Sequence, residues 1–342
     1  MSPPNPPLAT AARQPEDTSS PERFLDLIAD KLVATELVFR STLENDVPFV
    51  RKAGEYLFDG GGKRMRPALL LLSARLLERD SDEEVTYAAV IELIHTATLI
   101  HDDIIDQSSL RRGRRTVNDL WGNSLTVLLG DWLYTRALQK ALSHGNLAVI
   151  RHLCDATLRM TEGELLAQQR LGALDLSVDE YFDIIDRKTA QLFGAAAAIP
   201  SLMAPADAAA GEALRRYGKA LGTCFQVVDD LLDFTASERE LGKPVLGDLS
   251  DGKLTLPLIL LLPRVDSAAR EAIERVLEDR GFDRTPSGEI LDLVGREGTL
   301  NEAREIAGAW AESAREALAG LPDNEAREAL ELAPDFVLNR RH

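Results

Sequence analysis

The chain has only two cysteines in 342 residues, Cys154 and Cys224, and they lie far apart in the sequence. A disulfide scaffold or a structural zinc site needs cysteines at short, paired spacings, so the sequence argues against both. Two lone cysteines also fit a reducing compartment, and we expect the protein in the cytoplasm.

Long apolar runs are missing as well. No segment approaches the roughly 20 apolar residues that a helix needs to cross a bilayer. The first twenty residues lack the apolar core of a signal peptide and are rich in proline, alanine, serine and threonine. We therefore expect a soluble protein, with a disordered tail over residues 1–20 and one helical domain over residues 21–342.

Positive charge is scarce relative to negative charge. Lysine and arginine number 39 against 56 aspartates and glutamates, which gives a formal net charge of -17. Binding to a nucleic acid backbone needs a basic face, so nucleic acid is not an expected partner.

Strand patterns are absent too, because no segment shows a convincing alternation of apolar and polar residues. Helical periodicity recurs instead, and no change in composition marks a linker, so we predict an all-α fold. Ser81 and Glu84 resemble a capping box before the helix that ends near Asp106. The other expected helices are Pro21–Asn45, Pro48–Asp59, Ala68–Glu78, Asn118–Gly122, Leu125–Leu142, Leu147–Leu171, Val178–Ala198, Ala206–Phe234, Leu256–Leu262, Ser267–Asp279, Gly288–Gly298, Leu300–Ala319 and Asn324–Leu332.

Three aspartates, Asp102, Asp103 and Asp106, stand at the end of an apolar stretch that predicts a largely buried helix. Residues three or four positions apart are neighbours on a helix, so Asp102 and Asp106 stack one turn apart and Asp103 lies beside Asp106. Their mutual repulsion opposes folding unless a cation is bound, and oxygen ligands of this kind suit Mg²⁺ bridging to substrate phosphates. An acidic helix end on the surface is the alternative for a single motif.

The same spacing recurs at Asp229, Asp230 and Asp233, again after an apolar helical run. Two unrelated surface clusters with identical spacing are a poor explanation of this repeat. Two facing clusters can hold metal ions on either side of one diphosphate, which makes this charged group easier to expel.

Cationic residues also occur in clusters. A glycine-rich turn precedes Lys63, Arg64 and Arg66 at an expected helix start, which favours anion binding. The spacing is not that of a P-loop. Pairing with the acidic surface is the alternative for the arginines, and a solvated loop is the alternative for the lysines. Further cations are Arg111, Arg112, Lys188, Lys243 and Lys253. Together with the aspartates, these clusters describe a pocket for two diphosphates, one bound through metal and one bound directly.

From about Phe24 to the C-terminus, the order of these motifs resembles that of the trans-isoprenyl diphosphate synthases, especially medium- and long-chain members of the octaprenyl and solanesyl type. The resemblance implies the isoprenoid synthase fold, a single large helical bundle around a central cavity. The matching segments are Gly61–Pro67, Asp102–Asp106 with Arg111–Gly113, Gln226–Asp233, Gly242–Pro244 and Gly252–Pro257.

The resemblance also implies roles for individual residues. Asp102, Asp106 and Asp229 would bind Mg²⁺, the expected cofactor, with Asp103, Asp230 and Asp233 as ligands or as neighbours that orient the ligands. Arg111, Lys188, Lys243 and Lys253 would hold the allylic diphosphate, and Lys63, Arg66, His95 and Arg112 would hold isopentenyl diphosphate. Thr189 and Gln226 are candidates for steadying the allylic cation.

His95 lies two helical turns before Asp102 and so on the same face. Without the resemblance, a buried and hydrogen-bonded core histidine would be the preferred interpretation of this residue. His101 is adjacent to the aspartates but lies on a different face.

The implied reaction is head-to-tail condensation. Metal and cations neutralise the departing diphosphate, the double bond of isopentenyl diphosphate attacks the allylic cation, and the released diphosphate takes the proton.

Small residues before the first aspartates indicate a long product. Ala97 and Thr98 line the wall one turn below Asp102, where short-chain members of the family carry an aromatic residue. Ile94 lines the next turn, and Leu153 is the candidate floor. We expect a medium- to long-chain product, with geranylgeranyl diphosphate as the alternative.

Two other functions remain open. A terpene cyclase would use one such aspartate cluster but would not need the isopentenyl site, and an inactive scaffold or partner subunit predicts loss of one cluster, whereas both are intact. The family also implies a homodimer, and the absence of a membrane span leaves room for a peripheral membrane contact during product release.

Overall fold

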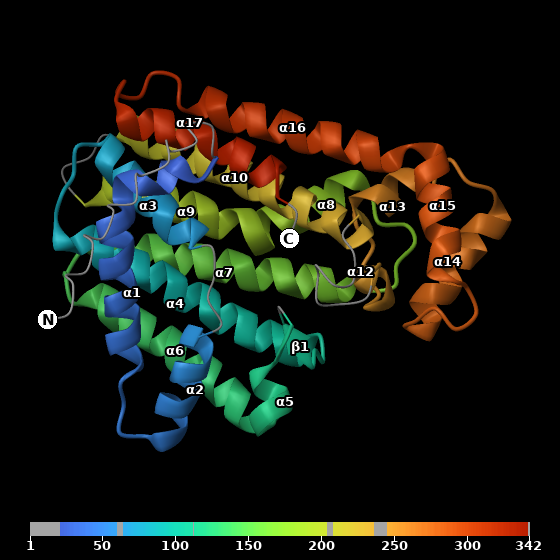
Figure 1. The fold of residues 1–342 in the computed structure, drawn as a ribbon, viewed down its shortest axis with the longest axis horizontal. Coiled ribbons are helices and arrows are strands. Elements are labelled where there is room, and N and C mark those ends of the chain that lie inside the picture. Colours follow the sequence, from blue (N-terminus) through green and yellow to red (C-terminus); the bar gives the residue numbers. More distant parts are fainter. Residues whose placement is uncertain (1–20, 60–63, 112, 204–207, 236–244, 341–342) are drawn as a thin grey trace, which may run out of the picture.

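The structure is a computed structural model that describes residues 21–59, 64–111, 113–203, 208–235 and 245–340. Most of this part of the chain is helical (Figure 1), which confirms the expected all-α fold. The expected tail over residues 1–20 lies outside the described residues, as do Lys63, Arg112 and Lys243. The domain boundary at residue 21 stays a prediction. Within the described ranges, no helix has the length and apolar character to cross a membrane.

Within the described ranges, the elements follow one another as helices with one short hairpin. They are η1 (Pro21–Ile28, a 3₁₀ helix), α1 (Ala29–Leu43), α2 (Pro48–Asp59), α3 (Met65–Leu76), α4 (Asp82–Ile105), β1 (Leu110–Arg111), β2 (Arg114–Arg115), α5 (Val117–Trp121), α6 (Asn123–Leu142), α7 (Leu147–Gln169), α8 (Val178–Ile185), η2 (Asp186–Ala190, a π helix), α9 (Gln191–Leu202), α10 (Ala208–Thr235), α12 (Gly247–Ser250), α13 (Leu256–Leu261), α14 (Ser267–Asp279), α15 (Ser287–Glu297), α16 (Thr299–Ala317) and α17 (Glu325–Leu338).

Two long helices organise the bundle. α10 packs most extensively against α9 and α16, and α4 packs along α6 and also against α3 and α1. In Figure 1, α4, α6, α7 and α10 run along the long axis, and α14 and α15 stand at one end. Fully buried side chains such as Ile91 of α4, Phe193 of α9 and Tyr217 of α10 form the core between them.

The register of α4 is set at its first turn. Ser81 and Glu84 form the predicted capping box, in which the backbone N–H of Ser81 donates to Glu84 Oε1 at 2.6 Å. The fully buried Glu84 is also held by Lys31 Nζ at 2.5 Å. The helix then continues without interruption to Ile105, so its C-terminal turns carry the first aspartate motif.

The helix predicted over Val178–Ala198 is interrupted by the π-helical segment η2. Two glycines of neighbouring helices press against this segment. A Cβ atom on Gly163 of α7 would lie 2.6 Å from the backbone nitrogen of Lys188, and one on Gly222 of α10 would lie 2.7 Å from Ala190 Cα. Because π segments recur at functional sites, this interruption supports a functional role for Lys188 and Thr189, which lie in it.

Two other predictions from the sequence were wrong in detail. A hairpin pairs Leu110 with Arg115 and Arg111 with Arg114, although no strand was expected. Its strands have two residues each, too short to show an alternating pattern. α17 continues past Pro334 to Leu338 instead of ending at Leu332, because its buried face packs on α16, α3 and α10.

Candidate active site

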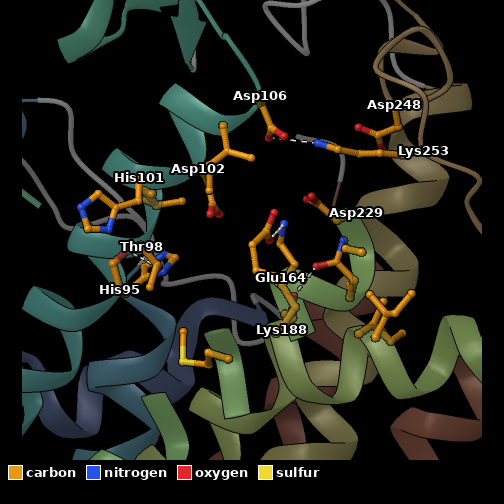
Figure 2. A pocket seen from close by; sticks show the side chains of 18 of the residues that line it. His95, Thr98, His101, Asp102, Asp106, Glu164, Lys188, Asp229, Asp248 and Lys253 are labelled. Atoms are coloured by element: carbon orange, nitrogen blue, oxygen red, sulfur yellow. Dashed lines mark hydrogen bonds and ion pairs between the residues drawn. The ribbon is translucent and has the colours of Figure 1, made fainter. Parts of the chain in front are cut away.

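A large cavity lies between α4, α7, η2 and α10, and side chains from α3 and from the segment between α12 and α13 complete its wall. Its volume is about 1380 Å³, above the roughly 300–1,000 Å³ of most ligand pockets, so it can hold a ligand larger than a typical metabolite. Figure 2 shows carboxylates from α4 and α10 on opposite sides of this space, with Glu164 and Lys188 between them.

The first aspartate motif divides between the cavity and the protein interior. Asp102 and Asp106, one turn apart, line the cavity, as their spacing predicts. Lys253 Nζ lies 2.9 Å from Asp106 Oδ2. Asp103 does not line the cavity; it is 4% exposed and accepts a hydrogen bond from Arg111 Nε at 2.7 Å. Asp103 therefore positions Arg111, whose own side chain lines the cavity.

The environment of Asp102 disfavours its charged form. The pKa of Asp102 is raised to about 6, mainly by burial and also by the negative charges of Glu164 and Asp106, while Lys188 and Arg111 oppose the shift. A cation that binds next to such a carboxylate therefore stabilises its charged form.

The second aspartate motif shows the same division. Asp229 and Asp230 line the cavity, whereas Asp233 is 1% exposed and accepts a hydrogen bond from the backbone N–H of Asp248 at 3.1 Å. Asp229 forms an ion pair with Arg340 near the C-terminus, at 3.2 Å. Asp230 accepts hydrogen bonds from the Tyr181 hydroxyl at 2.6 Å and from Gln226 Nε2 at 2.8 Å.

The cations and dipoles of η2 face both motifs. Lys188 pairs with Glu164 of α7 inside the cavity. Burial alone would lower the pKa of Lys188, but Asp102 and Glu164 raise it above its ordinary value, so the side chain stays charged. The Thr189 hydroxyl donates to Gln226 Oε1 at 2.8 Å, which orients both polar groups at the cavity wall.

A second basic subsite lies on α3 and α4. Arg66 Nη1 donates to His95 Nε2 at 3.0 Å, and the Arg66 guanidinium lies 4.4 Å from the centre of the Phe193 ring. Both residues line the cavity, as expected for a histidine two turns before Asp102. Arg64 turns instead to α4, where it donates to the buried Glu92 at 2.6 Å and so anchors the start of α3.

Several site residues were missed by reasoning from the sequence. These are Glu92, Glu164, Tyr181 and Arg340, each of which contacts a residue of a recognised motif. The one available signal was Gly163 beside Glu164, because a glycine inside a helix often marks a close approach. The other contacts join residues far apart in the chain.

The carboxylates fit a magnesium site that the substrate completes. In the described part of the chain, no three histidine, cysteine, aspartate or glutamate side chains gather closely enough to hold a metal ion by themselves. Mg²⁺ usually keeps several waters and binds through one or two carboxylates plus substrate phosphates. Asp102 with Asp106 on one wall and Asp229 on the opposite wall match that donor set (Figure 2).

Comparison with known proteins identifies the family. A profile described as polyprenyl synthetase matches residues 47–294. The chain belongs to this family. Octaprenyl diphosphate synthase of Escherichia coli K12 is 38% identical to this chain over 309 residues, which are 90% of this chain and 95% of that protein. A short chain isoprenyl diphosphate synthase of Methanothermobacter thermautotrophicus is 36% identical over 295 residues, 85% of this chain and 90% of that protein.

A solved structure agrees with this assignment. The polyprenyl synthase of Caulobacter crescentus CB15, complexed with calcium and isoprenyl diphosphate, superimposes with a TM-score of 0.89 and 36% identity, covering 96% of this chain and 100% of that one. This polyprenyl synthetase is therefore a trans-prenyltransferase with the isoprenoid synthase fold.

The buried Asp230 of the synthase predicts a pH-dependent stability. Burial raises the pKa of Asp230 to about 8, with Asp248 adding to the shift and the hydrogen bonds from Tyr181 and Gln226 opposing it. In the unfolded chain this carboxyl loses its proton near pH 3.9. Between these values the folded protein holds a proton that the unfolded chain has lost, so rising pH lowers stability.

We expect the Asp230→Asn variant of the synthase, free of ligand and metal, to melt a few degrees above wild type at pH 8. The difference should shrink towards pH 4, because the neutral amide has no proton to lose. Scanning calorimetry in a chelating buffer from pH 4 to pH 8 measures it. A difference in Tm that does not change with pH would contradict the assigned burial of this charge.

Proposed function

We propose that this synthase binds an allylic diphosphate through Mg²⁺, condenses isopentenyl diphosphate onto it and repeats the step to make an all-trans polyprenyl diphosphate of medium to long chain. One observation supports this above all. A single cavity contains two opposed carboxylate walls, at Asp102 and Asp229, and a separate basic subsite at Arg66 and His95. The carboxylate walls would bind the allylic diphosphate through metal, and the basic subsite would bind isopentenyl diphosphate directly.

The residues around the metal side would activate the leaving group. Mg²⁺, when bound, supplies the positive charge that stabilises the departing diphosphate. Lys188 and Arg111 would bind the same diphosphate, with Lys253 next to Asp106. If Lys253 exchanged its carboxylate partner for phosphate oxygens, Asp106 would become available to the metal beside Asp102, and Asp229 would become available once its ion pair with Arg340 opens.

The opposite subsite would orient the nucleophile. Arg66 and His95 would hold isopentenyl diphosphate so that its double bond faces the allylic carbon. The carbon–oxygen bond of the allylic diphosphate would break first, and the double bond would then attack the allylic cation to form the new carbon–carbon bond. The proton lost from the condensed product passes to the released diphosphate. Thr189 and Gln226 would steady the cation by their oriented dipoles, and the closed walls around them would exclude water that hydrolyses it.

Incorporation of radiolabelled isopentenyl diphosphate into longer prenyl chains tests this function. We expect incorporation that needs both an allylic diphosphate and Mg²⁺ and that stops when a chelator is added. A terpene cyclase would convert the allylic substrate without taking up label. An inactive scaffold or partner subunit would do neither.

Chain length depends on the depth of the cavity. Ala97, Thr98 and Ile94 of α4 line it, and no aromatic side chain stands at the first two positions. Leu153 of α7, the candidate floor, is fully buried and not part of the lining, although its neighbour Cys154 is. The cavity thus extends beyond the turn that carries Ala97, which supports a product longer than farnesyl diphosphate, with geranylgeranyl diphosphate as the alternative.

Replacing either small residue by phenylalanine should shorten the product. Ala97 is 2% exposed and faces the cavity, so a benzyl group in Ala97→Phe or Thr98→Phe fills the passage below Asp102. Chromatography of the dephosphorylated products measures the shift, and Thr98→Val, which keeps the volume, serves as the control. Products of wild-type length from both phenylalanine variants would show that the chain does not pass this turn.

The assembly and location are part of the same proposal. Four exposed leucines on α6 and α7, Leu125, Leu128, Leu158 and Leu165, are between 41% and 63% exposed, and apolar faces of this kind mark contact surfaces. They support a homodimer formed through α6 and α7. We place the enzyme in the cytoplasm, with a peripheral membrane contact where the apolar product leaves.

A further inference from the structure

Two side-chain contacts join the start of α3 to α4 at the wall of the cavity. Arg66 Nη1 lies 3.0 Å from His95 Nε2, and Arg64 Nη1 lies 2.6 Å from Glu92 Oε1. Glu92 and His95 are three residues apart on α4, so their side chains are neighbours on one face of that helix. All four residues line the cavity. The Arg64–Glu92 pair is therefore next to the subsite assigned to isopentenyl diphosphate.

The backbone of Arg64 adopts a conformation that is unfavourable for arginine. Its φ of 49° and ψ of 32° lie in the left-handed region, which residues with a side chain rarely adopt. Arg64 is also the N-cap residue of α3, where its side chain, a donor only, cannot accept hydrogen bonds from the backbone N–H groups of the first turn. Arg66 lies in this first turn. Its position therefore depends on what holds Arg64 in place.

Glu92 is the partner that holds the Arg64 side chain most firmly. The guanidinium also contacts α1, where Nε lies 3.4 Å from Glu36 Oε1 and the group lies 5.6 Å from the centre of the Phe39 ring. The Glu36 side chain is 45% exposed, so water weakens its attraction for the cation. The Glu92 side chain is 9% exposed and makes the shorter contact. Loss of the Glu92 charge would thus release Arg64 from α4.

We propose that Glu92 is a positioning residue for isopentenyl diphosphate, because through Arg64 it fixes the first turn of α3 and so holds Arg66 beside His95. This proposal rests on the proposed role of that subsite. Glu92 does not bind the substrate itself, since a carboxylate repels a diphosphate. Arg64 compensates its charge, so the pair fixes the geometry of the subsite and adds no net charge to it.

The Glu92→Gln variant tests this role because positioning and simple electrostatics predict opposite results. The substitution keeps the shape of the side chain and removes its negative charge. If charge alone mattered, the KM for isopentenyl diphosphate would fall, since a carboxylate beside an anion site is lost. If Glu92 positions Arg66, this KM rises roughly tenfold, because the released turn and its arginine must be ordered on binding. The kcat and the KM for the allylic substrate should stay at their wild-type values.

A second background and a matched control separate positioning from a general loss of stability. In Arg66→Ala, the further substitution Glu92→Gln should leave the KM for isopentenyl diphosphate unchanged, because the group that Glu92 positions is already gone. Glu84→Gln is the control. Glu84 is another buried glutamate of α4, paired with Lys31 Nζ at 2.5 Å, and it lies outside the cavity lining. This variant should lower the Tm and change neither KM.

The measurement is the initial rate of label incorporation over a range of isopentenyl diphosphate concentrations, at saturating allylic diphosphate and Mg²⁺, with the Tm of each variant. If Glu92→Gln does not fold, Glu92→Asp gives the same test with a smaller rise in KM, because it keeps the charge and draws the carboxylate back from Arg64. A KM at or below the wild-type value, an equal rise in both KM values, or the full effect in the Arg66→Ala background would overturn the proposal. Failure of the wild-type enzyme to incorporate label would instead refute the proposed function.

Discussion

Asp102→Ala and Asp229→Ala are each expected to lower turnover by several orders of magnitude. The two carboxylates come from opposite walls of the cavity, so each substitution would remove a carboxylate proposed to hold Mg²⁺ at one side of the diphosphate. Steady-state incorporation of labelled isopentenyl diphosphate, measured over a range of Mg²⁺ concentrations, gives the effect. Asp292→Ala, which removes an exposed carboxylate of α15, is the matched control.

The fold should survive these substitutions. Burial raises the pKa of Asp102 and so disfavours its charge in the ligand-free protein, and we therefore expect that its removal does not lower the Tm. Asp229 is half exposed and loses only its ion pair with Arg340. Near-wild-type kinetics in either variant would rule out the assignment of these aspartates to the metal.

The Arg66→Ala variant should raise the KM for isopentenyl diphosphate with little effect on that for the allylic substrate. Loss of one charged contact to a buried anion costs roughly 2–4 kcal/mol, or about thirty- to a thousand-fold. The guanidinium is already oriented by His95 and by the face of Phe193, so alanine removes a preformed binding group. The same effect is predicted for Lys63, which lies outside the described residues.

Separate titrations of the two substrates measure this effect, and Arg151→Ala, an exposed cation on α7 outside the cavity lining, is the control. An increase confined to the allylic KM would mean that the two diphosphate subsites are assigned the wrong way round. An equal increase in the KM for isopentenyl diphosphate in Arg66→Ala and Arg151→Ala would mean that the overall charge of the protein, and not this subsite, determines the affinity.

Local sequence signals predicted much of the candidate site. The capping box at Ser81 and the apolar repeat behind it set the start and the register of α4. The spacing of Asp102, Asp106 and His95 then follows from 3.6 residues per turn, and all three line one cavity. These are relations within one helix, and helix geometry is the same wherever the helix packs.

The sequence could not decide which member of each aspartate motif faces the cavity. Asp103 and Asp233 carry the same chemistry as their neighbours, yet Asp103 pairs with Arg111 and Asp233 accepts from the backbone of Asp248. Which side of a helix faces the interior depends on what packs against it. The same holds for the π segment η2, which is pressed by glycines of α7 and α10.

By itself, the sequence determined the helical fold, the helix registers and the pairing of acidic with basic motifs that is typical of the family, because each depends on residues close together in the chain. Only the tertiary structure decided the contacts across the cavity: Glu164 with Lys188, Arg340 with Asp229, and Tyr134 with Thr157. Each of these pairs joins two different helices, or the C-terminal end of the chain to one. Whether the two residues of a pair come into contact depends on the distance between the helices, and this distance is determined by the packing of the whole core.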